Sequence, residues 1–147
     1  MKGILTTHYN NYLREGNQFL TKGLWKEALN RFKKALAQKE TPEALEGIGM
    51  ASWWLDDSKT TFSVRERAYK LYRQRGDRRG AARIATWLAW DYDTIRGEAA
   101  VANGWIQRAH RLLGNLSPSP EHGWLAVREG ATVLLKNGDT ISSLKLA

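Results

Sequence analysis

The sequence GAARIATWLAWDYDTIRGEAAVANGWIQRAHRLL, residues 80–113, predicts two amphipathic helices joined by a turn at Arg96-Gly97. Apolar residues recur in the first helix at i, i+3, i+4 and i+7, which is one helical face; they are Ala85, Leu88, Ala89 and Tyr92. The second helix has a similar face, formed by Ala102, Ile106 and Ala109. Because neither helix can bury its face alone, we expect similar helix pairs on either side of this one.

The rest of the chain contains such pairs. We expect helices over residues 9–23, 25–39, 42–55, about 58–75 and 121–136, with a short final helix after Thr140. Small residues recur at one place in successive first helices, at Gly16, Gly49, Ala89 and Ala131, and in successive second helices, at Ala35, Ala68 and Ala109. Spacings of 33 to 42 residues in these series indicate a helical solenoid.

The turns between these helices carry residues that end or begin a helix. Gly23 and Gly76 stand where a terminating glycine is expected. Thr41 is placed to cap a helix, and Pro42 suits the first turn of that helix. In the segment 121–136 we expect Val127, Ala131 and Leu134 to face inward. The final helix has barely two turns, so this face is poorly covered, and we expect self-association through the C-terminal repeat.

Composition favours one all-helical domain. The 147-residue chain is 42% hydrophobic and 26% charged, and it contains no cysteine, which excludes disulfides and fits a reducing compartment. The N-terminal residues have no long apolar run and no cleavage site, so we expect no secretory signal. No stretch approaches the roughly 20 apolar residues of a membrane span. We therefore expect a cytoplasmic protein without a membrane partner.

The first helix pair resembles a tetratricopeptide repeat (TPR) in the positions of its aromatic and small residues, Tyr12, Gly16, Phe19, Ala28, Phe32 and Ala35. Pro42 lies two residues beyond the family's closing proline, and the second unit has Ser52, Thr61 and Arg65 where aromatic or alanine residues are usual. The resemblance implies an all-α, TPR-like solenoid of about seven helices plus a short C-terminal one. It would form a single domain over 1–147, with repeats at about 9–41, 42–78, 79–116 and an incomplete 121–147.

A narrower resemblance covers about two thirds of the chain. The phrases ALEGIGMASWWLDD, RERAYKLYRQRGDRRGAARIATWLAWDY, RGEAAVANGWIQRAHRLL and PEHGWLAVREG occur in the order seen in the repeat region of large bacterial LuxR-type transcriptional regulators. The resemblance implies the sensing or scaffolding part of a regulator. No helix-turn-helix is visible, so DNA binding is not assigned, and a fragment, a truncated product and a stand-alone repeat protein all stay open.

No residue set predicts catalysis, a metal or a cofactor. The glycines of Gly47-Ile48-Gly49 lie inside a predicted helix with no strand before them, unlike a dinucleotide-binding loop. His8, His110 and His122 are far apart and lack the spacing of metal ligands. Asp91 and Asp93 project to different sides of a helix, which argues against a catalytic carboxylate pair. We expect a non-enzymatic interaction module.

In TPR arrays the first helix of each pair lines a concave groove. Carrying this rule over predicts a groove for a protein or peptide, lined by Glu46, Met50, Trp53, Arg83, Thr86, Trp87, Trp90, Asp93 and Arg128. Aromatic, arginine and acidic side chains suit such a partner.

The alternative is nucleic-acid binding by the basic segment from Arg65 to Arg83, in a chain of net charge +8. These cations span a helix end and the following turn and do not form one continuous stripe, so we do not expect direct nucleic-acid binding. A small-molecule or enzyme site in a tryptophan-lined pocket is a third hypothesis, with no catalytic set to support it.

Overall fold

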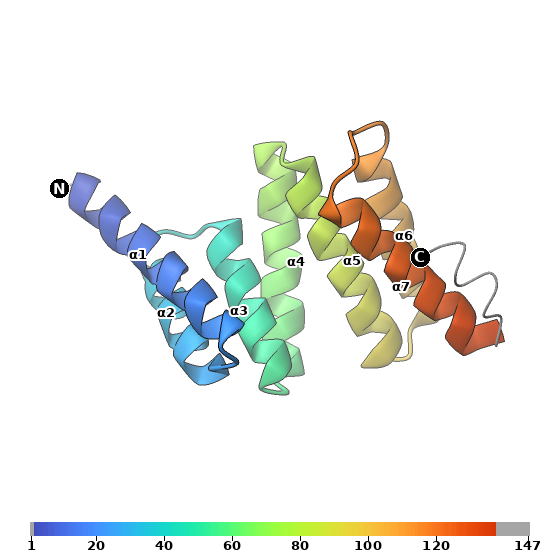
Figure 1. Ribbon diagram of the computed structural model, residues 1–147, viewed down its shortest axis with the longest axis horizontal. Helices are drawn as coiled ribbons and strands as arrows, with labels where there is room; N and C mark the ends of the chain where they lie inside the picture. Colours follow the sequence, from blue (N-terminus) through green and yellow to red (C-terminus); the bar gives the residue numbers. More distant parts are fainter. Residues whose placement is uncertain (1, 138–147) are drawn as a thin grey trace. The chain divides into compact units, whose positions relative to one another are not determined.

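The computed structural model describes residues 2–137, and this part of the chain is folded into α-helices without a strand (Figure 1). The helices are α1 (Lys2–Thr21), α2 (Trp25–Gln38), α3 (Pro42–Trp54), α4 (Ser58–Arg75), α5 (Arg78–Thr94), α6 (Ala99–Leu113) and α7 (Pro120–Asn137). The predicted all-α class is confirmed, and the helices match the expected ranges except that α1 begins at Lys2 rather than at residue 9. The expected helix after Thr140 lies outside the described residues.

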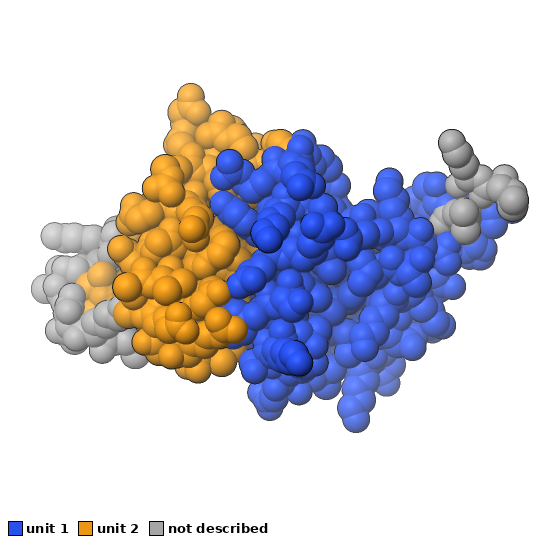
Figure 2. All heavy atoms as spheres, turned by 180° about the vertical axis from the view of Figure 1, so that it is seen from behind, with its two compact units in different colours: residues 1–75 blue, residues 76–147 orange. Residues whose placement is uncertain are grey.

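The chain divides into two compact units, residues 1–75 and 76–147 (Figure 2). In the first unit α1 packs on α2, α2 on α3 and α3 on α4, and α1 also contacts α3. In the second unit α5 packs on α6, and α7 contacts both of these helices. The division falls between the second and third predicted repeats, so each unit contains whole helix pairs plus, in the second, the single helix α7.

The two hairpins of the first unit share one packing arrangement. Gly16 of α1 lies against Phe32 of α2, where a Cβ on the glycine would come within 2.7 Å of the ring. Gly49 of α3 lies in the same way against Arg65 of α4, whose Cγ would be 3.1 Å from such a Cβ. Phe32 and Arg65 are both 1% exposed. The side chain of Arg65 therefore fills the place where the repeat pattern calls for an aromatic ring.

The neighbouring repeat positions are also buried. Thr61 replaces the usual alanine and is completely buried, and its hydroxyl donates a hydrogen bond of 2.8 Å to the backbone oxygen of Asp57. Ser52 and Ala68 are likewise 0% exposed. Around Phe32 the core continues through Ala28, Ile48 and Ala51. The departures from the TPR pattern are thus accommodated inside the helix pair.

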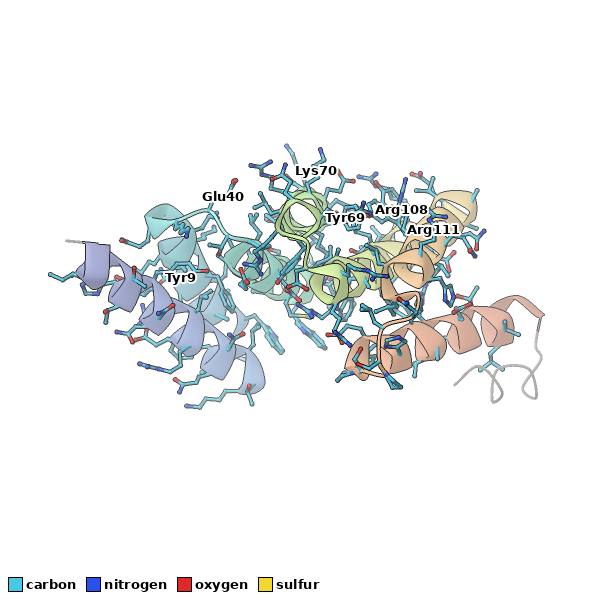
Figure 3. The ribbon with its side chains drawn as sticks, turned by 90° about the horizontal axis from the view of Figure 1, so that it is seen from above. Tyr9, Glu40, Tyr69, Lys70, Arg108 and Arg111 are labelled. Carbon is cyan, nitrogen blue, oxygen red and sulfur yellow. The ribbon has the colours of Figure 1, made fainter. Side chains whose placement is uncertain are left out.

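The predicted turns have the expected conformations. Gly23, Gly76 and Gly97 adopt φ values of +73°, +76° and +66°, which favour glycine. The Thr41 hydroxyl accepts the Ala44 amide at 3.3 Å, and the same oxygen lies 2.5 Å from the Tyr9 hydroxyl of α1 (Figure 3). Burial raises the pKa of Tyr9, while its bond to Thr41 acts in the opposite direction. Tyr9 therefore ties α1 to the start of α3.

In the second unit α5 and α6 bury the two faces that their periodicity predicted, formed by Ala85, Leu88, Ala89, Tyr92, Ala102, Ile106 and Ala109. The prediction for the buried face of α7 was wrong at Val127 and Leu134, whereas Ala131 is half-buried. Val127 and Leu134 are 47% and 43% exposed, and the residues buried on this helix include Leu125 and Arg128. The contacts of α7 are with α5 and α6, so the face that meets them is offset from the one predicted.

Candidate functional site

The predicted groove residues are divided between the two units. Glu46, Met50 and Trp53 belong to α3, whereas the other six belong to the second unit: Arg83, Thr86, Trp87, Trp90 and Asp93 in α5 and Arg128 in α7. Within the second unit, the structure brings Trp90, Asp93 and Arg128 together. These three residues form the centre of the candidate site.

Arg128 is the residue around which this site is built. Its guanidinium carbon lies 4.0 Å from the centre of the Trp90 ring, and its Nη2 lies 3.3 Å from Oδ2 of Asp93. The whole residue is only 6% exposed. Burial lowers the pKa of Arg128, and the nearby carboxylates of Asp93 and Asp91 oppose this effect. A cation–π contact and an ion pair thus hold a buried positive charge between α5 and α7.

A pocket of about 260 Å³ lies beside this charge, between α5, α6 and α7. Its lining combines small and aliphatic residues with a guanidinium, two carboxylates, an amide and a hydroxyl. The lining residues are Ala89, Asp93, Ala99, Ala102, Asn103, Ile106, Arg128, Glu129, Thr132 and Val133. Apolar walls with a few convergent polar groups are typical of ligand sites.

A hydrogen bond and an ion pair also hold α7 beside the pocket. Nε2 of His110 in α6 lies 2.6 Å from Oε1 of Glu129, and Nη1 of Arg83 in α5 lies 2.9 Å from Oε1 of Glu121. Burial by itself raises the pKa of Glu121, but its backbone amide, Ser119 and Arg83 outweigh burial, so the pKa is lowered. Arg83 therefore has a positioning role at the start of α7.

The other predicted groove residues make local contacts. The hydroxyl of Thr86 donates to the backbone oxygen of Ala82 at 2.9 Å, and Trp87 is half-buried. In the first unit, Glu46 accepts a hydrogen bond from the Tyr72 hydroxyl, and Met50 is half-buried. None of these residues lines the pocket between α5, α6 and α7.

Trp53 belongs to an aromatic cluster that the sequence did not predict. Its ring meets Trp54 edge-on, with centroids 4.9 Å apart, and Trp54 stacks on Trp25 of α2 at 4.7 Å. Trp54 is 50% exposed. The cluster joins α2 to the end of α3 inside the first unit.

Several pocket residues were also missed from the sequence, among them Asn103, Glu129 and Thr132. A partial signal was present, because Leu125, Arg128 and Thr132 recur at i, i+3 and i+7 along one helical face. Two residues of this face, Arg128 and Thr132, are polar, so its periodicity was not recognised as that of a buried face. Asn103 and Glu129 have no such pattern, since they come from two different helices.

The basic segment from Arg65 to Arg83 is largely engaged within the protein. Arg65 is buried, and Arg67 and Arg75 pair with Glu40 and Glu43. Arg78 donates to the backbone oxygen of Leu112, and Arg79 to that of Ser117. These contacts tie the cations to their own units.

A metal site and a dinucleotide-binding loop were also considered from the sequence. Among the residues it describes, no group of His, Asp and Glu side chains could hold a metal ion. The glycines of the Gly47–Gly49 segment lie within α3, where they contact Phe32 and Arg65. Across the same described range, no helix is both long and apolar enough to cross a membrane.

Comparison with protein-family models finds no match, and comparison with curated proteins finds none either.

Proposed function

We propose that this protein is a non-catalytic helical-repeat module that binds a protein or peptide. The observation that carries the proposal is the repeated packing of small residues against the second helix of each pair. Gly16 against Phe32 and Gly49 against Arg65 follow one pattern, and α5 and α6 bury the corresponding Ala89 and Ile106. Repeats of this kind use the surface of successive first helices for recognition.

We also propose that the repeats are of the tetratricopeptide kind, stacked as a solenoid, and that they serve as the sensing or scaffolding part of a LuxR-type regulator in the cytoplasm. The support is the agreement between the buried positions and the repeat pattern of the sequence, together with the order of the four sequence phrases over residues 44–130. This proposal assigns no DNA binding to the residues that the structure describes.

The test uses a peptide selected from a displayed library on the full chain. We expect Arg83→Ala and Trp90→Ala to weaken binding of the selected peptide by about tenfold or more, as for central interface residues. Arg108→Ala is the matched control, because Arg108 belongs to α6, the second helix of its pair, outside the predicted groove, and stacks on Trp105 of the same helix at 4.4 Å. Unchanged affinity in both variants, with unchanged circular dichroism, would remove these residues from the binding surface.

A further inference from the structure

The pocket between α5, α6 and α7 contains a buried guanidinium that is only partly satisfied. Nη2 of Arg128 binds Asp93, whereas Nη1 is buried and has no hydrogen-bond partner in the part of the chain that the structure describes. Leaving a buried N–H of a charged group without an acceptor is costly. An oxygen acceptor that reached Nη1 from the pocket would remove this cost, and a carboxylate would do so most strongly.

The same pocket also presents negative charge. Asp93 and Glu129 line it, with side chains 20% and 27% exposed. Two carboxylates disfavour a simple anion, and the guanidinium disfavours a simple cation. A ligand that carries both an ammonium and a carboxylate group matches both kinds of lining group.

Size and apolar lining restrict the ligand further. A pocket of about 260 Å³ lies below the range of roughly 300–1,000 Å³ that is usual for drug-sized ligands. Alanines at 89, 99 and 102 leave this space open, and Ile106 and Val133 make part of its wall aliphatic. This combination suits one short aliphatic side chain.

We propose that this pocket binds a free α-amino acid with an aliphatic side chain, a function beyond the partner binding proposed above. Arg128 takes the carboxylate, Asp93 and Glu129 take the ammonium, and the alanines with Ile106 and Val133 take the side chain. Because the carboxylate, the ammonium group and the side chain of an amino acid are all bonded to its α-carbon, a small pocket can contact all three.

The first experiment is isothermal titration of the full chain with L-leucine and two analogues. Leucinamide lacks the carboxylate, and 4-methylpentanoate lacks the ammonium group. We expect one saturable site for leucine and affinities lower by about tenfold or more for each analogue, the usual effect of losing a charged hydrogen bond. Leucinamide binding as tightly as leucine, or the absence of binding by every aliphatic amino acid tested, would overturn the proposal. Tighter binding of a leucine-initiated dipeptide would assign the pocket to a peptide terminus instead.

The second experiment uses variants. Arg128→Met keeps an apolar stem but removes the guanidinium, and it should abolish the preference for leucine over leucinamide. Arg108→Met is its control, because this arginine also stacks on a tryptophan but lies outside the pocket lining. If Arg128→Met disturbs folding, Ala99→Leu tests the same proposal. Ala99 is exposed and lines the pocket, so a larger side chain at this position should block the binding of leucine. Unchanged leucine binding in Ala99→Leu would refute the amino-acid site. It would not bear on the peptide-binding proposal, which the Arg83→Ala and Trp90→Ala variants test.

Discussion

Phe32 lies directly against Gly47, so that a Cβ on this glycine would collide with the aromatic ring. The ring is 1% exposed and also touches Gly16 of α1. One side chain of α2 thus fills the space that two glycines leave open on the two adjacent helices. This contact explains why glycine occurs inside α1 and α3, where the residue otherwise weakens a helix.

Gly47→Ala and Gly16→Ala are therefore expected to destabilise the protein by about 1–3 kcal/mol, the usual cost of overpacking a core. Because Phe32 is enclosed, it cannot move aside easily. Gly104→Ala is the control: this residue lies within α6 with nothing within 4 Å of an added Cβ. It should stabilise by up to about 1 kcal/mol through helix propensity. Urea unfolding measures the stability of all three variants, and stabilisation of Gly47→Ala and Gly16→Ala equal to that of Gly104→Ala would contradict the argument.

The spacing of apolar residues along the sequence predicted most of the helices, because the helices of the first three pairs each bury an apolar face. Gly23, Thr41 and Gly76 then marked where helices end or begin. The same method misplaced the buried face of α7, whose contacts are made partly by Arg128. A buried arginine looks like a surface residue in a hydrophobicity pattern, and only its neighbours Trp90 and Asp93 show otherwise.

The candidate site was predicted only in part for a related reason. Trp90, Asp93 and Arg128 were expected to line a groove, and the structure brings them together. Asn103 and Glu129 complete the pocket from other helices. Their position depends on how α6 and α7 pack on α5, and periodicity within one helix carries no information about that packing.

Stability of the second unit should fall in acid because of Glu121. The pKa of this carboxyl is lowered in the folded protein, so its contribution to stability is complete above the unfolded pKa of about 4.3 and is lost as the pH falls through the folded value. Glu121→Gln should reduce the loss of unfolding free energy between pH 7 and pH 3. Glu98→Gln, an exposed residue with no side-chain cap bond, is the control. An unchanged pH profile in Glu121→Gln would contradict the lowered pKa of this carboxyl, to which its backbone amide, Ser119 and Arg83 all contribute.

Nucleic-acid binding should be weak at physiological salt. The carboxylates of Glu40, Glu43 and Glu121 already pair with arginines of the basic segment. Arg108 and Arg111 project from one side of α6 and are exposed, but two such cations give few phosphate contacts (Figure 3). Filter binding with duplex DNA should show little retention, with no difference between the wild type and Arg108→Ala/Arg111→Ala. Strong retention with a steep dependence on salt concentration would contradict this expectation.

Self-association is expected through the outer face of α7. Trp124, Val127 and Leu134 recur at i, i+3 and i+10, and they are 65%, 47% and 43% exposed, so the helix presents an apolar stripe to solvent. Such stripes commonly mark contact surfaces. Sedimentation equilibrium should show a concentration-dependent dimer that Val127→Glu abolishes, because a pair of facing carboxylates would be buried at a symmetric contact. Gln107→Glu, on the exposed surface of α6, adds the same charge elsewhere and should leave the dimer intact. A strict monomer at high concentration would show that this stripe does not mediate self-association.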